Sequence, residues 1–493
     1  MALIPLKIAP GIYRNGTEYE QSGRWRDGSL IRWSEGSLRP VGGWTQFTGT
    51  AFAAKPRGIH GWAQNNGNVN IAAGTYNKLY YISTAGNVSD ITPTSGFTVG
   101  EEEASQNTAY SGSTYGTGLY GVARNPSDNT TPATTWAIDN WGEYLVACSS
   151  DDGKILQWQL DPSVKAAPLT NAPTSNRSIV VTEERFIFAL GSGGNPRKIS
   201  WCDRESDTVW TAAATNEAGD IELQTEGKLM TGIRVRGRTL ILTSSDAHVA
   251  TYQGPPYVYG FERVGSACGT ISPRSLVSAD KFAFWMGPKG FFAYDGSVAI
   301  EKTCDVADYV FGDINTSQMS KVYGVHNSRF SEVWWFYPSA SSIENNRYVV
   351  YDYKDNIWFF GQLGRTAGID VGPKNFPIWS GTNGHLYLQE YGFAKDGAAS
   401  FIESGPIELG AGERVMRVTS VVPDEGVQGD VNVTFKTKNY PNGAETTTSS
   451  FNTANPTDVR FTGRQVKMRL ESQNNNDFRI GTFRLEARPG GKR

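Results

Sequence analysis

The stretch "KFAFWMGPKGFFAYDG" (281–296) reads as an apolar strand, a Gly/Pro turn and a second strand rich in aromatic residues. The same unit recurs along the chain as "VNIAAGTYNKLYYIS" (69–83), "EYLVACSSDDGKILQWQL" (143–160), "RFIFALGSGGNPRKISWC" (185–202), "TLILTSSDAHVATYQG" (239–254), "EVWWFYPSASSIENNRYVVYDY" (332–353) and "FPIWSGTNGHLYLQE" (376–390). From the second unit onward, successive units begin 42, 54, 42, 51 and 44 residues apart. A hairpin at this spacing, with further apolar strands between, predicts the blades of a β-propeller.

The composition agrees with an all-β chain of more than one domain. A length of 493 residues exceeds one ordinary core, so two or three domains are expected. Aromatic residues make up 12%, charged residues only 19%, and 55 residues are glycine. This balance suits short strands joined by tight turns. No stretch approaches the roughly 18 apolar residues of a membrane span, and the start does not resemble a secretory signal.

The repeat predicts a six- or seven-bladed propeller over residues 56–398. The first two units begin 74 residues apart, which leaves room for an extra blade or an insertion. Residues 94–135 are rich in Gly, Ser, Thr and Asn, a composition typical of a surface or interface loop. We therefore interpret 94–135 as an insertion.

Residues 399–493 follow a different pattern. Six runs, among them "GPIELG", "GDVNVTFKTKNY" and "RQVKMRLESQ", alternate apolar and polar residues with period two. This alternation predicts a C-terminal antiparallel β-sandwich of jelly-roll type. In "VKMRLES" it places Val466, Met468 and Leu470 inward and Lys467 and Arg469 outward.

Residues 1–55 fit neither pattern and form a candidate clasp. "GRWRDGSLIRWSEGSLRPVGGWTQF" (23–47) holds three tryptophans and four arginines, with "DGS" and "EGS" at matched positions. A nucleic-acid stacking platform, an aromatic subsite of an enzyme and a strand–turn–strand clasp would all use such residues. The matched turns favour the clasp. We interpret it as a β-hairpin that seals the propeller or bridges to a neighbour, where Trp and Arg are common anchors. The alternative is that all three tryptophans pack inside one subunit.

Catalytic chemistry finds little support in the sequence. Ser149, Asp151 and Gly153 begin like the Ser-x-Asp-x-Gly box of sialidases, but Lys154 follows where that box has an aromatic residue. We interpret them as a hairpin turn, because Asp and Gly tolerate positive φ. The four cysteines are interpreted as buried thiols in strands, and "DRESDTVW" (203–210) lacks the ligand pattern of a calcium loop. The sequence predicts no catalytic residue, no cofactor and no metal, and so no enzyme.

The formal net charge of −3 is unevenly distributed. Residues 1–60 carry a net +4 and residues 460–493 a net +6, so the body between them carries −13. Basic ends on an acidic body disfavour a nucleic-acid-binding core and favour docking between like subunits. The acidic residues either line a channel along which a polyanion slides or form a solvated outer surface.

Several segments resemble tail structural proteins of tailed bacteriophages. They are "MALIPLKIAPGIYRNGTEYEQSGRWRDGSLIRWSEGSLRPVGGW" at the start, "TYGTGLYGVAR" (114–124), "TTWAIDNWGEYLVACSSDDGKILQW" (134–158) and the terminal "RQVKMRLESQNNNDFRIGTFRLEARPGGKR". With the fold prediction, the likeness is to the tail hub or nozzle proteins of short-tailed phages, also called packaged-DNA-stabilisation proteins. This chain is shorter than many nozzle proteins, which argues against additional plug or fibre-docking domains.

The resemblance implies a ring subunit of the virion tail, commonly in six copies, made in the host cytoplasm. Such a ring docks below the portal and adaptor, adjoins distal tail proteins and meets double-stranded DNA only in transit through its channel. It retains the genome until ejection. The predicted subunit-interface residues are Arg24, Trp25, Arg26, Arg32, Trp33, Arg39, Trp44, Tyr115 and Tyr120. Two alternatives stay open: a glycan- or receptor-binding tail module and a carbohydrate-active propeller enzyme.

Overall fold

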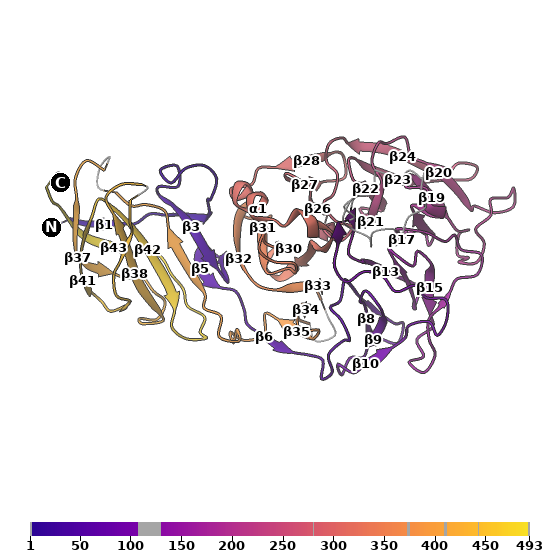
Figure 1. Ribbon diagram of the computed structural model, residues 1–493, viewed down its shortest axis with the longest axis horizontal. Helices are drawn as coiled ribbons and strands as arrows, with labels where there is room; N and C mark the ends of the chain where they lie inside the picture. The colour runs from indigo at the N-terminus through magenta and orange to yellow at the C-terminus, as the bar shows by residue number, and fades with distance from the viewer. Residues whose placement is uncertain are drawn as a thin grey trace, which may run out of the picture.

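The computed structural model describes residues 2–106, 130–279, 281–371, 375–408, 412–441 and 443–491. Figure 1 shows two lobes side by side along the longest axis, a ring of small sheets and a lobe of longer strands. Both chain ends lie at the far end of the second lobe, which we call the sheet lobe. The segment that includes β5 (Ser37–Pro40) and β6 (Trp44–Gln46) runs from the sheet lobe to the ring.

The ring is a seven-bladed β-propeller in the described part of the chain, and each blade is a four-stranded antiparallel sheet. From the innermost strand outward, blade 1 consists of β7 (Gly58–Ala63), β8 (Val69–Gly74), β9 (Leu79–Ile82) and β10 (Val88–Asp90). Blade 2 consists of β13 (Trp136–Trp141), β14 (Tyr144–Ser149), β15 (Ile155–Trp158) and β16 (Ala167–Pro168). Blade 3 consists of β17 (Ser178–Val181), β18 (Ile187–Leu190), β19 (Lys198–Trp201) and β20 (Gly219–Glu222). Blade 4 consists of β21 (Leu229–Val235), β22 (Arg238–Thr243), β23 (Ala247–Gly254) and β24 (Val258–Gly265), and blade 5 of β25 (Val277–Ala279), β26 (Phe282–Met286), β27 (Phe291–Tyr294) and β28 (Ala299–Lys302). Blade 6 consists of β29 (Tyr323–Asn327), β30 (Glu332–Tyr337), β31 (Arg347–Asp352) and β32 (Ile357–Gln362). Blade 7 consists of β33 (Arg365–Ile369), β34 (Ile378–Gly381), β35 (Leu386–Gln389) and β6.

The seven repeated hairpins of the sequence are the two middle strands of the seven blades, which confirms the propeller. In the described part of the long interval between the first two units, the structure has no further blade. It has the two-stranded sheet of β11 (Ser105–Gln106) and β12 (Thr130–Thr131) there. Much of the predicted insertion lies outside the described residues. Helical structure is confined to α1 (Ala307–Asp313) and the short 3-10 turns η1 (Ser192–Gly194), η2 (Thr316–Lys321) and η3 (Ser328–Phe330) in the described ranges.

The ring closes through the N-terminal segment. First strands of successive blades contact one another around the axis, and β33 of blade 7 contacts β7 of blade 1. Strand β6 then pairs with β35 as the outer strand of blade 7, Trp44 opposite Gln389. The last blade is therefore completed by a strand from the other end of the sequence, which covers an otherwise open sheet edge.

Blade packing explains why some strands are apolar on both faces. Every residue of "EVWWFY" in β30 is buried, since neighbouring blades cover both sides of the sheet. Trp334 faces blade 7, its ring 5.2 Å from that of Trp379. Trp335 faces blade 5, where its indole N–H donates to the Ser275 carbonyl at 2.8 Å. Adjacent residues thus anchor opposite neighbours.

The sheet lobe contains two sheets, and strands from both ends of the chain contribute to each. One has the order β1 (Ala2–Pro5), β43 (Arg484–Pro489), β37 (Met416–Val422), β41 (Thr457–Gly463). The other joins β2 (Ala9–Ile12), β3 (Arg24–Ser29), β36 (Phe401–Ser404), β42 (Gln465–Ser472) and β38 (Val431–Lys438), with β39 (Thr446–Thr447) and β40 (Phe451–Asn452) on β38. Phe435 and Phe461 stack with ring centroids 4.5 Å apart, one from each sheet. The predicted jelly-roll-like sandwich stays a prediction, since β2 and β3 pair in parallel and N-terminal strands enter both sheets.

Two details of the sequence-based prediction for this lobe were wrong. Val466, Met468 and Leu470 are buried as expected, but Lys467 is buried as well. Its ammonium lies 2.7 Å from Glu18 Oε1 on the N-terminal segment, which covers that face of β42. The run "GPIELG" forms no strand in its described part; only Ile407 bridges to Val466.

Candidate functional site

The arginine at the centre of the predicted clasp lies inside the protein. Arg32, on β4 (Ile31–Ser34), is 1% exposed. Its Nε donates to Glu332 Oε1 at 2.8 Å and one terminal nitrogen donates to Glu390 Oε2 at 2.9 Å. Its guanidinium also lies over the Phe330 ring at 3.6 Å. We call Arg32, Glu332 and Glu390 the buried ionic cluster; it ties the N-terminal segment to blade 6 and to the exit from blade 7.

The cluster holds one cation and two carboxylates away from water. Burial raises the pKa of Glu332 to about 7, against the opposing effect of Arg32 and with a contribution from Glu390. Further hydrogen bonds reach oxygens that already accept from Arg32: Trp334 Nε1 donates to Glu332 Oε2 at 2.8 Å, and Asn327 Nδ2 donates to Glu390 Oε1 at 3.1 Å. A buried cluster of this kind fixes geometry because neither partner can leave without stranding a charge.

The three tryptophans of the clasp are buried in the same chain. Trp25, Trp33 and Trp44 are 6–7% exposed. Trp33 packs edge-on against Phe359 of blade 6, and Trp44 Nε1 donates to Asp396 Oδ2 at 2.6 Å. With Arg32 they pack in the interior of the subunit, and a contact between these four residues and a neighbouring subunit stays a prediction. These residues are buried because the N-terminal segment closes blade 7 and forms the junction between the two lobes.

The other predicted interface residues lie closer to solvent. Arg24 pairs with Asp305 at 3.0 Å, Arg26 with Glu18 at 2.9 Å and Arg39 with Glu35 at 2.6 Å. Their side chains are partly exposed, so the interface hypothesis stays a prediction for them. Tyr115 and Tyr120 lie outside the described residues.

The four cysteines are free and buried, as predicted, although only Cys148 lies within a strand. Burial raises the pKa of the Cys202 thiol to about 12 and that of Cys268 to about 11, which keeps both protonated at neutral pH. The "SSDDG" segment is the turn between β14 and β15, and Gly153 adopts φ +65 there. A Cβ at that position would lie 2.7 Å from the Ser175 Cα.

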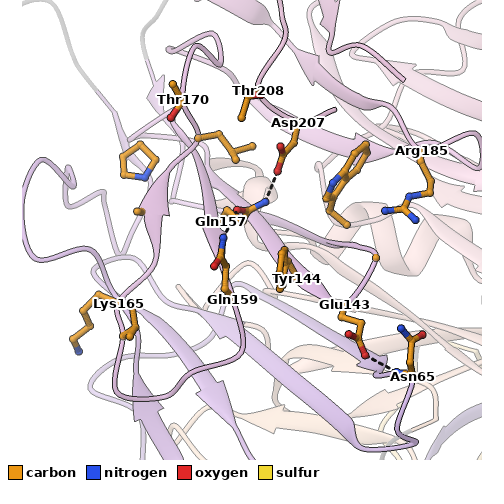
Figure 2. A pocket seen from close by; sticks show the side chains of 16 residues that line it. Asn65, Glu143, Tyr144, Gln157, Gln159, Lys165, Thr170, Arg185, Asp207 and Thr208 are labelled. Atoms are coloured by element: carbon orange, nitrogen blue, oxygen red, sulfur yellow. Dashed lines mark hydrogen bonds between the residues drawn. The ribbon is translucent and has the colours of Figure 1, made fainter. Parts of the chain in front are cut away.

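A separate groove of about 830 Å³ lies on blade 2 and reaches loops of blades 1 and 3. Figure 2 shows Gln157, Gln159, Asp207 and Tyr144 around its floor. Gln157 donates to the Asp207 carboxylate, and Gln159 donates to Gln157 Oε1 at 3.3 Å. Tyr144 is 40% exposed. We call this the blade-2 groove.

The edges of the blade-2 groove carry charge and a second aromatic ring. The Arg185 guanidinium lies 5.3 Å from the centre of the Trp141 ring, and Glu143 Oε1 accepts a hydrogen bond of 2.6 Å from the Asn65 amide. Amides, hydroxyls and carboxylates beside an exposed ring recognise ligands with many hydroxyl groups and one apolar face. Sequence reasoning missed this groove, because its residues come from three blades and form no local motif.

Metal chemistry finds no site in the described ranges, where no three His, Cys, Asp or Glu side chains come together as ligands. Nor does any described helix have the length and apolar character needed to cross a bilayer.

Comparisons with known proteins address the fold only. No protein-family model and no curated protein matches the chain. Among solved structures it is similar to a streptogramin B lyase, with 10% identity over 70% of this chain and 96% of the other and a TM-score of 0.41. Virginiamycin B lyase from Staphylococcus aureus matches with 10% identity, 70% and 97% coverage and a TM-score of 0.42. PorZ, a surface component of the type-IX secretion system of Porphyromonas gingivalis, matches with 9% identity, 76% and 44% coverage and a TM-score of 0.39. With identities and TM-scores this low, the activities of these proteins are not assigned to this chain.

Proposed function

We propose that the chain is a non-enzymatic structural subunit of a bacteriophage tail, a hub or nozzle protein that assembles into a ring. In this role several copies, six by the sequence resemblance, extend the DNA channel between adaptor and distal tail proteins. The ring holds the genome in place and then lets it pass. No catalytic residue is needed for this task.

The path of the N-terminal segment carries the proposal. This segment, which resembles tail proteins, supplies β1, β2 and β3 to the sheet lobe, β4 to the buried ionic cluster and β6 to blade 7. The lobes are also linked directly, since the Leu30 amide donates to the Tyr348 hydroxyl at 2.7 Å. These contacts restrain movement of one lobe against the other, which suits a subunit that bears the pressure of packaged DNA.

Surface charge supports docking between subunits. Residues 56–398 contain 34 Asp and Glu against 26 Lys and Arg, a net −8. On the sheet lobe, Arg417 and Arg488 are exposed and directly opposite each other in register on β37 and β43. No described carboxylate forms an ion pair with either of them. Like charges in opposite positions destabilise a sheet, and an acidic neighbouring surface relieves that cost.

Sedimentation velocity over a range of protein and salt concentrations, followed by electron microscopy, tests ring formation. We expect closed rings at low salt and fewer rings at high salt, because exposed ion pairs are screened. Arg417→Glu with Arg488→Glu should reduce assembly, while Arg238→Glu, on a propeller strand, serves as the control. A monomer at every concentration, with and without adaptor protein, would contradict the proposal.

The blade-2 groove favours a second candidate function, glycan binding by the tail. Tyr144 offers an exposed ring, and Gln157, Gln159 and Asp207 offer hydrogen-bond donors and acceptors beside it. A pocket of about 830 Å³ accommodates a short oligosaccharide.

A glycan array followed by calorimetry tests this candidate. Binding of a glycan to the wild-type chain should fall at least about tenfold in Tyr144→Ala, since ring stacking and one hydrogen bond each contribute about 1 kcal/mol or more. Tyr257→Ala, which removes a 78% exposed ring outside the groove, is the matched control. Equal binding by both variants would exclude the groove as the glycan site.

A further inference from the structure

A cavity of about 310 Å³ lies on the propeller axis. Its walls come from the innermost strands of five blades: His60 on β7, Asp139 on β13, Val180 on β17, Arg234 on β21 and Ser278 on β25. Arg274, just before β25, completes the polar lining. Side chains that are distant in sequence thus converge at one point, as they do in ligand sites of ring-shaped folds. We call it the axial cavity.

Arg274 has no anionic partner among the described residues. Its guanidinium lies 5.4 Å from the centre of the Tyr323 ring and donates weakly to the Tyr323 hydroxyl at 3.3 Å. Its Nε is buried and makes no hydrogen bond. A buried donor without an acceptor costs about 1–3 kcal/mol, so the protein itself leaves the hydrogen-bonding capacity of this guanidinium partly unused.

Asp139 cannot neutralise both arginines of the axial cavity. Its Oδ1 accepts from the backbone amide of Asn140 at 2.9 Å and from Arg234 at 3.0 Å. Its Oδ2 accepts from the Val181 amide at 3.0 Å. The carboxylate is therefore satisfied by Arg234 and backbone amides, and the guanidinium of Arg274 remains as surplus positive charge.

His60 reports the same electropositive environment. Its Nε2 donates to Asn140 Oδ1 at 3.1 Å. The side-chain Nδ2 of Asn140 donates to the Gly142 carbonyl, so Oδ1 is the atom that faces His60. Burial lowers the pKa of His60; Asp139 and Asn140 oppose this, while Arg234 and Arg274 lower it further. The lowered pKa favours the neutral form of His60 in the unliganded cavity, and an added negative charge would favour its protonation.

We propose that the axial cavity binds a small oxyanion, a carboxylate or a phosphate group, between the guanidinium groups of Arg274 and Arg234. Planar guanidinium groups bind such anions through paired N–H donors. Ser278 and Thr231 add hydroxyl donors to the lining, and the volume suits a ligand of only a few non-hydrogen atoms beyond the anionic group. The site belongs to a single subunit and does not depend on ring formation.

Calorimetry with inorganic phosphate, at constant ionic strength, tests the site, and a parallel titration with acetate distinguishes phosphate from carboxylate preference. We expect saturable binding of one anion per chain. Arg274→Gln and Arg234→Gln should each weaken it at least about tenfold, because each removes a charge-assisted hydrogen bond. Arg263→Gln, an exposed arginine on the outer strand of the same blade as Arg234, should bind like the wild type.

Proton uptake gives a second readout. Titrations near pH 6.5 in two buffers of different ionisation enthalpy should show proton uptake on binding in the wild type and a loss of that uptake in His60→Gln. Absence of saturable binding of either anion to the folded chain would overturn the proposal. Equal affinity in Arg274→Gln and Arg263→Gln, with unchanged melting temperatures, would overturn it as well.

Discussion

Replacing Arg32 with methionine should destabilise the junction between the two lobes severely. The side chains of Glu332 and Glu390 are 1% and 4% exposed, so both carboxylates would remain buried without their cation. Breaking a buried ion pair by removing one partner costs about 3–5 kcal/mol. That loss is a large part of the roughly 5–15 kcal/mol that stabilises a typical domain.

A comparison within the same hairpin isolates the effect. Arg39 lies directly opposite Arg32 in the β4–β5 register, but it pairs with Glu35, whose side chain is 78% exposed. Arg39→Met should therefore cost no more than about 1 kcal/mol. The triple variant Arg32→Met, Glu332→Gln, Glu390→Gln leaves no charge in the cluster and should recover at least half of the loss.

Urea unfolding monitored by tryptophan fluorescence, together with hydrogen exchange of β4 and β5, measures these differences. The exchange data matter because a protein of two lobes need not unfold in a single step. The reasoning would be refuted by an Arg32→Met variant within about 1 kcal/mol of the wild type, or by a triple variant no more stable than the single one.

Three further predictions concern the same framework. Because the pKa of Glu332 is raised to about 7, folded protein binds the extra proton between about pH 4.5 and 7. The Glu332 contribution to the free energy of unfolding is therefore fully present below about pH 4.5 and is lost as pH rises through 7. Subtracting the free energy of unfolding of Glu332→Gln from that of the wild type at each pH should show this fall. Trp44→Ala should cost about 3–5 kcal/mol and speed proteolysis near blade 7, whereas unchanged protection would argue against closure by β6. Gly74→Ala places a Cβ 2.3 Å from the Trp136 ring and should lower stability by about 1–3 kcal/mol in chemical unfolding.

The hairpins of the propeller could be predicted because their information is local. Each unit carries its own turn residues between two apolar strands, and blade stacking explains why strands such as "EVWWFY" have no polar face. The N-terminal hairpin was expected to seal the propeller or to bridge to a neighbour, but the strand pairing that closes the propeller could not be predicted in this way. Trp44 pairs with Gln389, and nothing in the local pattern of either strand specifies a partner so distant in sequence.

The clasp shows the same limit. Its tryptophans and arginines indicate an important contact, and the predicted turn at "EGS" (35–37) does join β4 and β5 in a hairpin. The predicted turn at "DGS" (27–29) was wrong, because these residues lie within β3. Only the three-dimensional structure reveals that Arg32 meets Glu332 and Glu390. Both glutamates lie in segments whose apolar pattern gives no sign of an ion pair. The axial cavity and the blade-2 groove were missed for a related reason, since each gathers side chains from several blades.

The proposed function requires that a phage encodes the chain, and quantitative mass spectrometry of purified virions of that phage tests this central claim most directly. If the protein is a ring subunit of the tail, it should be present in intact particles at a fixed ratio to the portal protein, about six copies per particle by the sequence resemblance. Particles that carry portal and adaptor but lack this chain, while the infected cell contains it in quantity, would contradict the proposed function.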